Sequence, residues 1–157
     1  MERDRMELDR TDRQILAILQ EDGRLTNAAL AERVHLSASA CLRRVQRLEH
    51  DGVIVGYAAL LEPAVLGRST SVFVEVSLDS QREEALRAFE QAARDCPDVF
   101  ECHLMSGGSD YLLRVAVNDT RDYERVHKQH LSRMPHVAHI RSSFALRTIC
   151  QRRALPL

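Results

Sequence analysis

SASACLRRVQRL, residues 37–48, is the stretch that decides the fold of this chain. Its apolar residues recur at helical spacing, which predicts a helix with one buried face. Ser37 can cap this helix, because its hydroxyl can accept a hydrogen bond from a first-turn N–H that has no partner within the helix. No acid interrupts the opposite face before Glu49, so we expect that face to expose Ser39, Arg43, Arg44 and Arg47. An ordinary solvated helix can have this pattern, and so can a helix that contacts phosphates and base edges.

The residues before this stretch favour a nucleic-acid contact. Residues 26–34 predict a short helix that Thr26 or Asn27 can cap, and His35 and Leu36 then form a tight turn. Two short helices joined in this way are the helix-turn-helix pattern, and a first helix over residues 8–21 would complete a three-helix domain. We therefore assign the candidate contacts with double-stranded DNA to Ser37, Ser39, Ala40, Arg43, Arg44 and Arg47.

The charge of the chain is balanced rather than basic. Its net charge is −1, and residues 1–60 contain nine arginines against ten aspartates and glutamates. This argues against a broad basic surface and favours a small contact patch, on the helix at residues 37–48, that oligomerisation repeats. No apolar run approaches the roughly 20 residues that span a membrane, and the charged N-terminus does not resemble a secretory signal. We therefore expect a cytoplasmic protein that does not interact with membranes.

The second half of the chain alternates between strand and helix patterns. Residues 70–78 alternate apolar and polar side chains, which predicts a half-buried strand. A helix at 81–94, strands at 99–105 and 110–117, a helix from 120 to about 134 and a strand at 137–148 follow. The order βαββαβ is a ferredoxin-like unit. The predicted fold class is therefore α+β: an N-terminal helix-turn-helix, followed by a ferredoxin-like βαββαβ domain.

The connection between the halves marks the domain boundaries. Pro63 and Gly67 punctuate a connector, so we place the DNA-binding domain at residues 1–61, the linker at 62–69 and the ferredoxin-like domain at 70–157. The β-branched run after Gly52 resembles a wing, or a strand leaving the first domain. Both helices of the second domain would cover one face of its sheet, and the other face also carries apolar residues. A second copy is the simplest cover, so we expect at least a homodimer.

Residues that could carry catalysis or bind a metal form no recognisable constellation. The four cysteines include no C-x-x-C pair, and the histidines have no carboxylate or cysteine at a matching spacing. The chain also lacks a nucleophile elbow, a P-loop and a dinucleotide fingerprint. We therefore expect neither an enzyme nor a metal or cofactor site.

Short motifs along nearly the whole chain match one known pattern. They are LDRTD at 8–12, DGRLTN at 22–27, CLRRV at 41–45, RLE at 47–49, GVI at 52–54, ECHL at 101–104, DYLLR at 110–114, RSSFAL at 141–146 and LPL at 155–157. With these motifs the chain resembles the Lrp/AsnC (leucine-responsive, or feast/famine) transcriptional regulators. The resemblance implies a DNA-binding regulator whose dimers assemble into tetramers or octamers and bind a small amino-acid effector between them.

The resemblance also implies an effector site in the second domain. The backbone N–H groups of Gly107 and Gly108 could bind a carboxylate, and Asp110, followed by Tyr111, could pair with an ammonium group. Family positions tied to effector response fall on Leu104, Thr120, Ser143 and Phe144. These side chains are mostly apolar or small, so we expect an effector of the leucine or methionine type. In the simpler interpretation, the two glycines only form a hairpin turn.

Two departures from the family pattern leave alternatives open. Ala38 and Ala40 stand where family members often carry proline, which would pre-set the first helical turn. Gly108 stands where the effector loop often carries an acid, which leaves an effector-independent regulator as one alternative. Siroheme decarboxylases resemble the same two-domain layout, so an enzyme of that type is another, and a sensor that has lost DNA binding is a third. A helix with solvent-facing arginines favours the DNA-binding regulator, because an enzyme has no need of it.

Overall fold

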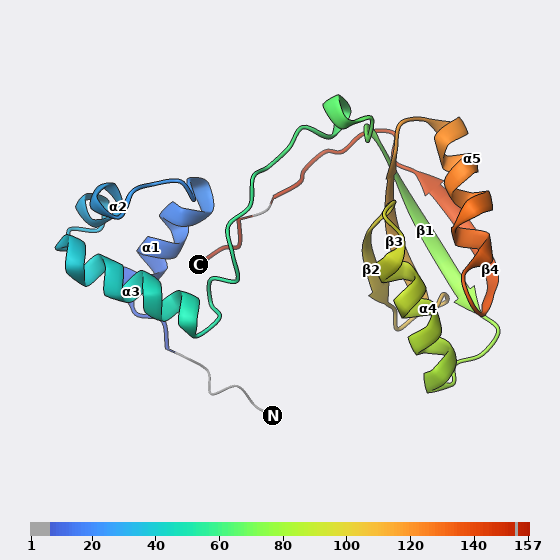
Figure 1. The fold of residues 1–157 in the computed structure, drawn as a ribbon, viewed down its shortest axis with the longest axis horizontal. Coiled ribbons are helices and arrows are strands. Elements are labelled where there is room, and N and C mark those ends of the chain that lie inside the picture. The colour runs from blue at the N-terminus through green and yellow to red at the C-terminus, as the bar shows by residue number, and fades with distance from the viewer. Residues whose placement is uncertain (1–6, 153) are drawn as a thin grey trace. The chain divides into compact units, whose positions relative to one another are not determined.

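Three helices build the first part of the chain: α1 (Arg10–Glu21), α2 (Asn27–Arg33) and α3 (Ala38–His50) (Figure 1). In the computed structural model, which describes residues 7–152 and 154–157, each helix begins at a side-chain cap. Asp9, Thr26 and Ser37 accept hydrogen bonds from the third residue beyond them. The turn between α2 and α3 passes through His35, whose φ of 55° lies in the left-handed region. The predicted helix-turn-helix is thus confirmed.

The first unit has its own apolar core, formed by Ile15, Leu16, Leu30, Ala31, Val34, Cys41 and Leu48. Val53 and Ile54 pack against this core, and both of their N–H groups donate to the Leu48 carbonyl, at 2.9 and 3.0 Å. Residues 51–62, all of which the structure describes, contain no strand. The run after Gly52 therefore closes α3 and leaves as an extended connector instead of forming a strand of a wing, since its N–H groups are already used at the helix end.

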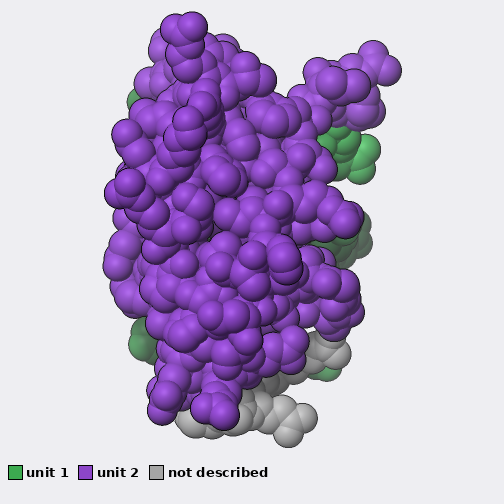
Figure 2. Space-filling view, turned by 90° about the vertical axis from the view of Figure 1, so that its right-hand side faces the viewer, with its two compact units in different colours: residues 1–60, 150–157 green, residues 61–149 purple. Residues whose placement is uncertain are grey.

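The last residues of the chain belong to the first unit. The chain divides into residues 1–60 with 150–157, and residues 61–149, as the colours of Figure 2 mark. The side chain of Gln20 donates to the Leu155 carbonyl at 3.1 Å and accepts from the Leu155 N–H at 2.6 Å. Leu155 and Leu157 also line an apolar groove of about 390 Å³ with residues of α1 and of the segment after α3. Residues 150–157 therefore contact the first unit, whereas the expected domain boundaries assigned them to the second domain.

The second unit is a four-stranded antiparallel sheet with two helices. Its elements are β1 (Thr70–Leu78), α4 (Glu83–Asp95), β2 (Val99–Leu104), β3 (Tyr111–Val117), α5 (Thr120–Gln129) and β4 (Val137–Phe144), with short 3₁₀ helices η1 (Pro63–Leu66) and η2 (Leu131–Arg133). The strand order is β2-β3-β1-β4. Both α4 and α5 lie on one face of the sheet (Figure 1). This arrangement confirms the predicted ferredoxin-like unit.

The two faces of the sheet differ in their cover. Val72, Val74 and Val76 of β1 are buried against the helices, whose contributions to this core include Phe89 and Val126. The alternate residues of each strand form the opposite face, which we call the open face. No helix of the unit covers the open face, so Phe73 on this face is 40% exposed. Its other members include Glu75, Phe100, Leu112, Arg114, Arg141 and Ser143.

Two elements end earlier than expected. The helix predicted to reach about Met134 stops at Gln129, and the short helix η2 follows it. The last strand ends at Phe144, which pairs with Val72 near the start of β1, so β1 offers little further backbone to pair with. Leu146, which the predicted strand at 137–148 included, is consequently fully exposed.

Within the described part of the chain, no cluster of three or more histidine, cysteine or acidic side chains is placed to hold a metal ion. No described helix combines the length and the apolar character that crossing a membrane requires.

Candidate nucleic-acid interface and effector site

The N-terminal turn of α3 is held by two side chains. Ser37 Oγ accepts from the Ala40 N–H at 3.2 Å and lies 3.3 Å from Ser39 Oγ. Asn27 of α2 donates to the Ala38 carbonyl at 2.7 Å. This bond ties the start of α3 to the preceding helix, so the first turn is fixed although Ala38 and Ala40 stand at positions where proline would pre-set it.

The three arginines of α3 are not equivalent. Arg44 Nη1 donates to Asp9 Oδ2 at 2.6 Å and to Asp12 Oδ1 at 2.8 Å. Arg47 Nη2 donates to Asp12 Oδ2 at 2.6 Å. The sequence predicted that these arginines face solvent and did not predict that two of them pair with acids. Each of the two still exposes part of its side chain, 30% for Arg44 and 46% for Arg47.

The acids that pair with these arginines belong to the capping box of α1. Asp9 caps the helix by accepting from the Asp12 N–H at 2.7 Å, and this bond, with the one from Arg44, lowers the pKa of Asp9. The two acids in turn raise the pKa of Arg44. Sequence reasoning missed this pairing. The available signal was the spacing, because Asp9 and Asp12 are three residues apart and so are Arg44 and Arg47.

Arg43 is the arginine of α3 that makes no ion pair with any described residue. A hollow of about 370 Å³ lies on this side of the helix and is lined by Leu36, Ala40, Arg43, Arg44 and Arg47. The structure therefore brings four of the six predicted DNA contacts around one concavity. The other two, Ser37 and Ser39, lie at the N-terminal end of the same helix. A concave surface rich in guanidinium donors suits phosphate oxygens and guanine edges.

The β2–β3 hairpin brings together part of the expected effector site: Leu104, Gly107, Gly108 and Asp110. Neither glycine has a positive φ, and a Cβ added to either would meet no atom within 4 Å. The conformation and packing of a single chain therefore do not require glycine at these positions. This favours close approach of a ligand or another chain over the simpler interpretation of a plain turn.

Asp110 fastens the hairpin to the end of β1. Its Oδ2 accepts from the Leu78 N–H at 2.7 Å, and its Oδ1 accepts from Gln81 Nε2 at 3.0 Å. Tyr111 was expected in the effector site, but it is a buried core residue in this chain. Its ring packs on Phe89 with centroids 4.6 Å apart, and burial raises the pKa of its hydroxyl. The register pairs Tyr111 with Val76, which places its side chain on the face that the helices cover.

The remaining expected effector residues lie at the other end of the sheet. Thr120 is the first residue of α5, while Ser143 and Phe144 end β4 and pair with Phe73 and Val72. The hairpin, by contrast, adjoins the Val76 end of β1. At about 3.3 Å per residue, the separation along β1 alone is about 13 Å, more than one amino-acid side chain spans. One chain therefore does not assemble these residues into a single pocket.

Both halves of the chain match models of known families. Residues 8–55 match the winged helix-turn-helix DNA-binding model. Residues 71–155 match the Lrp/AsnC ligand binding domain. The chain belongs to the Lrp/AsnC family of transcriptional regulators. Its family has a helix-turn-helix domain that binds DNA and a second domain that binds a ligand, so the resemblance found in the sequence is confirmed.

Relatives within the Lrp/AsnC family align over almost the entire chain. The Bkd operon transcriptional regulator of Pseudomonas aeruginosa is 45% identical over 151 residues, which are 96% of this chain and 99% of the relative. The leucine-responsive regulatory protein of Escherichia coli is 42% identical over 92% of this chain and 88% of its own length. A solved complex of a transcriptional regulator from Neisseria meningitidis with L-Met superimposes with a TM-score of 0.90 at 39% identity, covering 96% of this chain and 97% of that one.

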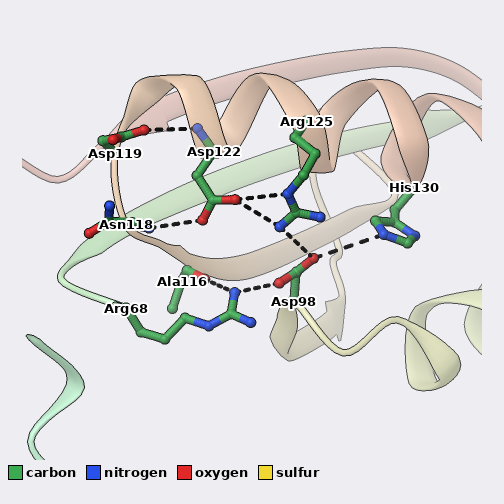
Figure 3. Close-up of polar contacts among 8 residues, drawn as sticks. All are labelled: Arg68, Asp98, Ala116, Asn118, Asp119, Asp122, Arg125 and His130. Carbon is green, nitrogen blue, oxygen red and sulfur yellow. Dashed lines mark hydrogen bonds and ion pairs between the residues drawn. The ribbon is translucent and has the colours of Figure 1, made fainter. Parts of the chain in front are cut away.

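A buried ion network in the second unit of this Lrp/AsnC chain was missed by sequence reasoning (Figure 3). Asp98, 2% exposed, accepts from Arg68, which also donates to the Ala116 carbonyl at 2.9 Å. Its other oxygen lies 3.4 Å from Arg125 Nη2 and 4.0 Å from His130 Nε2. The network ties the residues before β1 to the start of β2 and to α5.

Proposed function

We propose that this Lrp/AsnC regulator acts on cytoplasmic DNA and contacts it through α3. Arg43 would bind phosphate, and the unpaired N–H groups of Arg44 and Arg47 would bind phosphate or guanine edges. Ser37, Ser39 and Ala40 would lie near the bases at the start of the helix. The observation that carries this proposal is the hollow in which Ala40 and three arginines meet. The names of the relatives, all transcriptional regulators, also support a regulator over a decarboxylase-like enzyme.

DNA binding should be strongly salt-dependent. If two chains each place three arginines on phosphates, log K should fall against log salt with a slope of about −5, since each contact contributes about −0.9. Arg43→Ala removes two contacts per dimer and should flatten the slope by about 2. Fluorescence anisotropy with a labelled duplex from upstream of the chain's own gene, at about 50 to 200 mM salt, measures both slopes. Arg133→Ala, an equal charge change in the second unit, is the matched control. Equal slopes for Arg43→Ala and the original chain would exclude this helix surface.

We further propose that a free amino acid of the leucine or methionine type binds at the β2–β3 hairpin. Among the described residues, the N–H groups of Gly107 and Gly108 have no hydrogen-bond partner and could bind its carboxylate. The Asp110 oxygens retain lone pairs for its ammonium group, and Leu104, 63% exposed, offers apolar surface. The L-Met complex of the Neisseria meningitidis relative supports this class of effector. Thr120, Ser143 and Phe144 would contribute only from a second chain, at a contact between dimers.

Calorimetry across the twenty amino acids tests this site. Leucine or methionine should bind, and Asp110→Asn should weaken binding about tenfold or more, because a charge-assisted bond to the ammonium is lost. Gly108→Ala should also weaken binding while leaving stability unchanged, since its Cβ meets nothing within the chain. Asp79→Asn removes an exposed acid that pairs with His136 near the same end of the sheet and should bind as before. If no amino acid binds at millimolar concentration, the regulator is effector-independent.

We also propose that the chain forms a homodimer through the open face and that its dimers assemble into tetramers or octamers. An antiparallel sheet with helices on one face needs a cover for apolar residues on the other. Phe73 and Phe100 are 40% and 52% exposed there, which supports a second copy as that cover.

A further inference from the structure

Asp12 is a charged residue in the first unit whose burial the cap of α1 does not explain. Its side chain is 1% exposed. One oxygen accepts from Arg44, and the other accepts from Arg47 and, at 3.3 Å, from the Asp9 N–H. Burying a carboxylate is costly, and such groups persist only with good compensation. Both compensating cations come from α3, the helix that presents the hollow described above.

Stability alone does not account for this arrangement. Buried ion pairs contribute little net stability, because apolar residues of similar volume often do as well or better. The capping box of α1 uses one oxygen of Asp12, which accepts from the Asp9 N–H, and it requires neither arginine. A carboxylate that receives two arginines from one helix face does something that a cap does not, because it fixes the position of two guanidinium groups relative to each other.

The pairing leaves each arginine able to donate elsewhere. Arg44 uses Nη1 for both acids, and Arg47 uses Nη2 for Asp12. The Nε and the second Nη nitrogen of each remain as donors in the plane of the guanidinium, whose geometry suits guanine or phosphate oxygens. A guanidinium that is held on one side before DNA arrives loses its side-chain freedom on folding instead of on binding.

Because of this pairing, the charges of Arg44 and Arg47 are offset by acids, whereas the charge of Arg43 is not offset by any described residue. Asp9 and Asp12 offset the charges of Arg44 and Arg47, so this four-residue cluster is neutral overall. Arg43 is not offset in this way and remains available for general attraction to phosphate. A neutral but rigid cluster attracts phosphates at long range less than Arg43 does, and its donors can still contact phosphates or base edges at defined positions once α3 is docked.

We propose that Asp12 is a positioning residue for DNA recognition, which orients Arg44 and Arg47 for base edges or defined phosphates. This inference rests on the proposed contact between α3 and DNA. It assigns sequence discrimination to the Asp12 cluster and general affinity mainly to Arg43.

Asp12→Asn in the full-length chain tests this assignment. Anisotropy is measured with a duplex selected from a randomised pool and with a scrambled duplex of equal length, at one salt concentration. The specificity ratio is the dissociation constant of the scrambled duplex divided by that of the selected duplex. It should fall about tenfold or more, the scale on which paired guanidinium contacts discriminate between bases. Binding to the scrambled duplex should stay equal or tighten, because the variant gains one positive charge per chain.

An unchanged ratio would overturn the proposal, whether the variant melts earlier or binds both duplexes more tightly. Val34→Ala is the control for stability, because Val34 belongs to the apolar core of the first unit and does not line the hollow, so the variant should keep the ratio. If Asp12→Asn does not fold, Arg47→Lys replaces it: the charge opposite Asp12 stays, the planar fork is lost, and the ratio should fall. A retained ratio in that variant would contradict the role. If the original chain selects no sequence, the contact of α3 with DNA itself fails.

Discussion

Asp98→Ala is expected to lower the free energy of unfolding of the second unit by about 2–4 kcal/mol. Removing one partner of a buried pair typically costs about 3–5 kcal/mol. We expect somewhat less, because Arg68 and Arg125 are 31% and 40% exposed and water can partly solvate them. The loss falls on three elements at once, since Asp98 joins the start of β2 to α5 and to the residues before β1 (Figure 3).

Hydrogen exchange of the β1 and β3 amides is the appropriate measurement, because it reports the second unit separately from the first. Asp79→Ala is the matched control. The Asp79 side chain is 61% exposed and pairs with His136. Removing this surface pair should change stability by less than about 1 kcal/mol. Equal protection in the two variants would mean that the network around Asp98 contributes no more than a surface pair.

Local patterns were sufficient to predict most of the fold. The caps of α2 and α3 and both ends of β1 lie where the sequence placed them, because a cap or an alternating strand is determined by residues a few positions apart. The order of strands and helices along the chain followed from the order of the sequence patterns. The end of β4 was missed because it depends on where its partner β1 begins, which no local pattern of β4 contains.

The contacts that define the sites are long-range, and sequence patterns did not reveal them. Asp12 and Arg47 are 35 positions apart, and Gln20 and Leu155 are 135 apart. The face of each helix could be predicted, whereas the acid that lies opposite an arginine depends on how α1 crosses α3. The expected effector residues were likewise assigned correctly to elements in several cases, but the antiparallel register separates Thr120 and Phe144 from the hairpin.

Phe73→Glu is expected to convert a dimer into a monomer at micromolar concentration. Phe73 lies on β1, a central strand of the sheet, and is 40% exposed in the single chain. A second copy packed on the open face would bury this position. Its cross-strand neighbour Arg114 already pairs with Glu101 at 2.7 Å, so the new carboxylate would be buried without a partner of its own, which costs several kcal/mol. Each 1.4 kcal/mol is tenfold, so dimer dissociation should rise about a thousandfold or more. The nearby acids Glu75 and Glu101 would add repulsion.

Sedimentation velocity measures this change, and circular dichroism checks that the variant keeps its fold. Val65→Glu is the matched control, because it places an acid at an 82% exposed apolar position in η1, outside the sheet, and should remain dimeric. A dimer of undiminished stability in Phe73→Glu would place the interface elsewhere than on the open face.

The same variant links assembly to DNA binding. A monomer presents one α3 hollow instead of two, so the slope of log K against log salt should fall from about −5 to about −3.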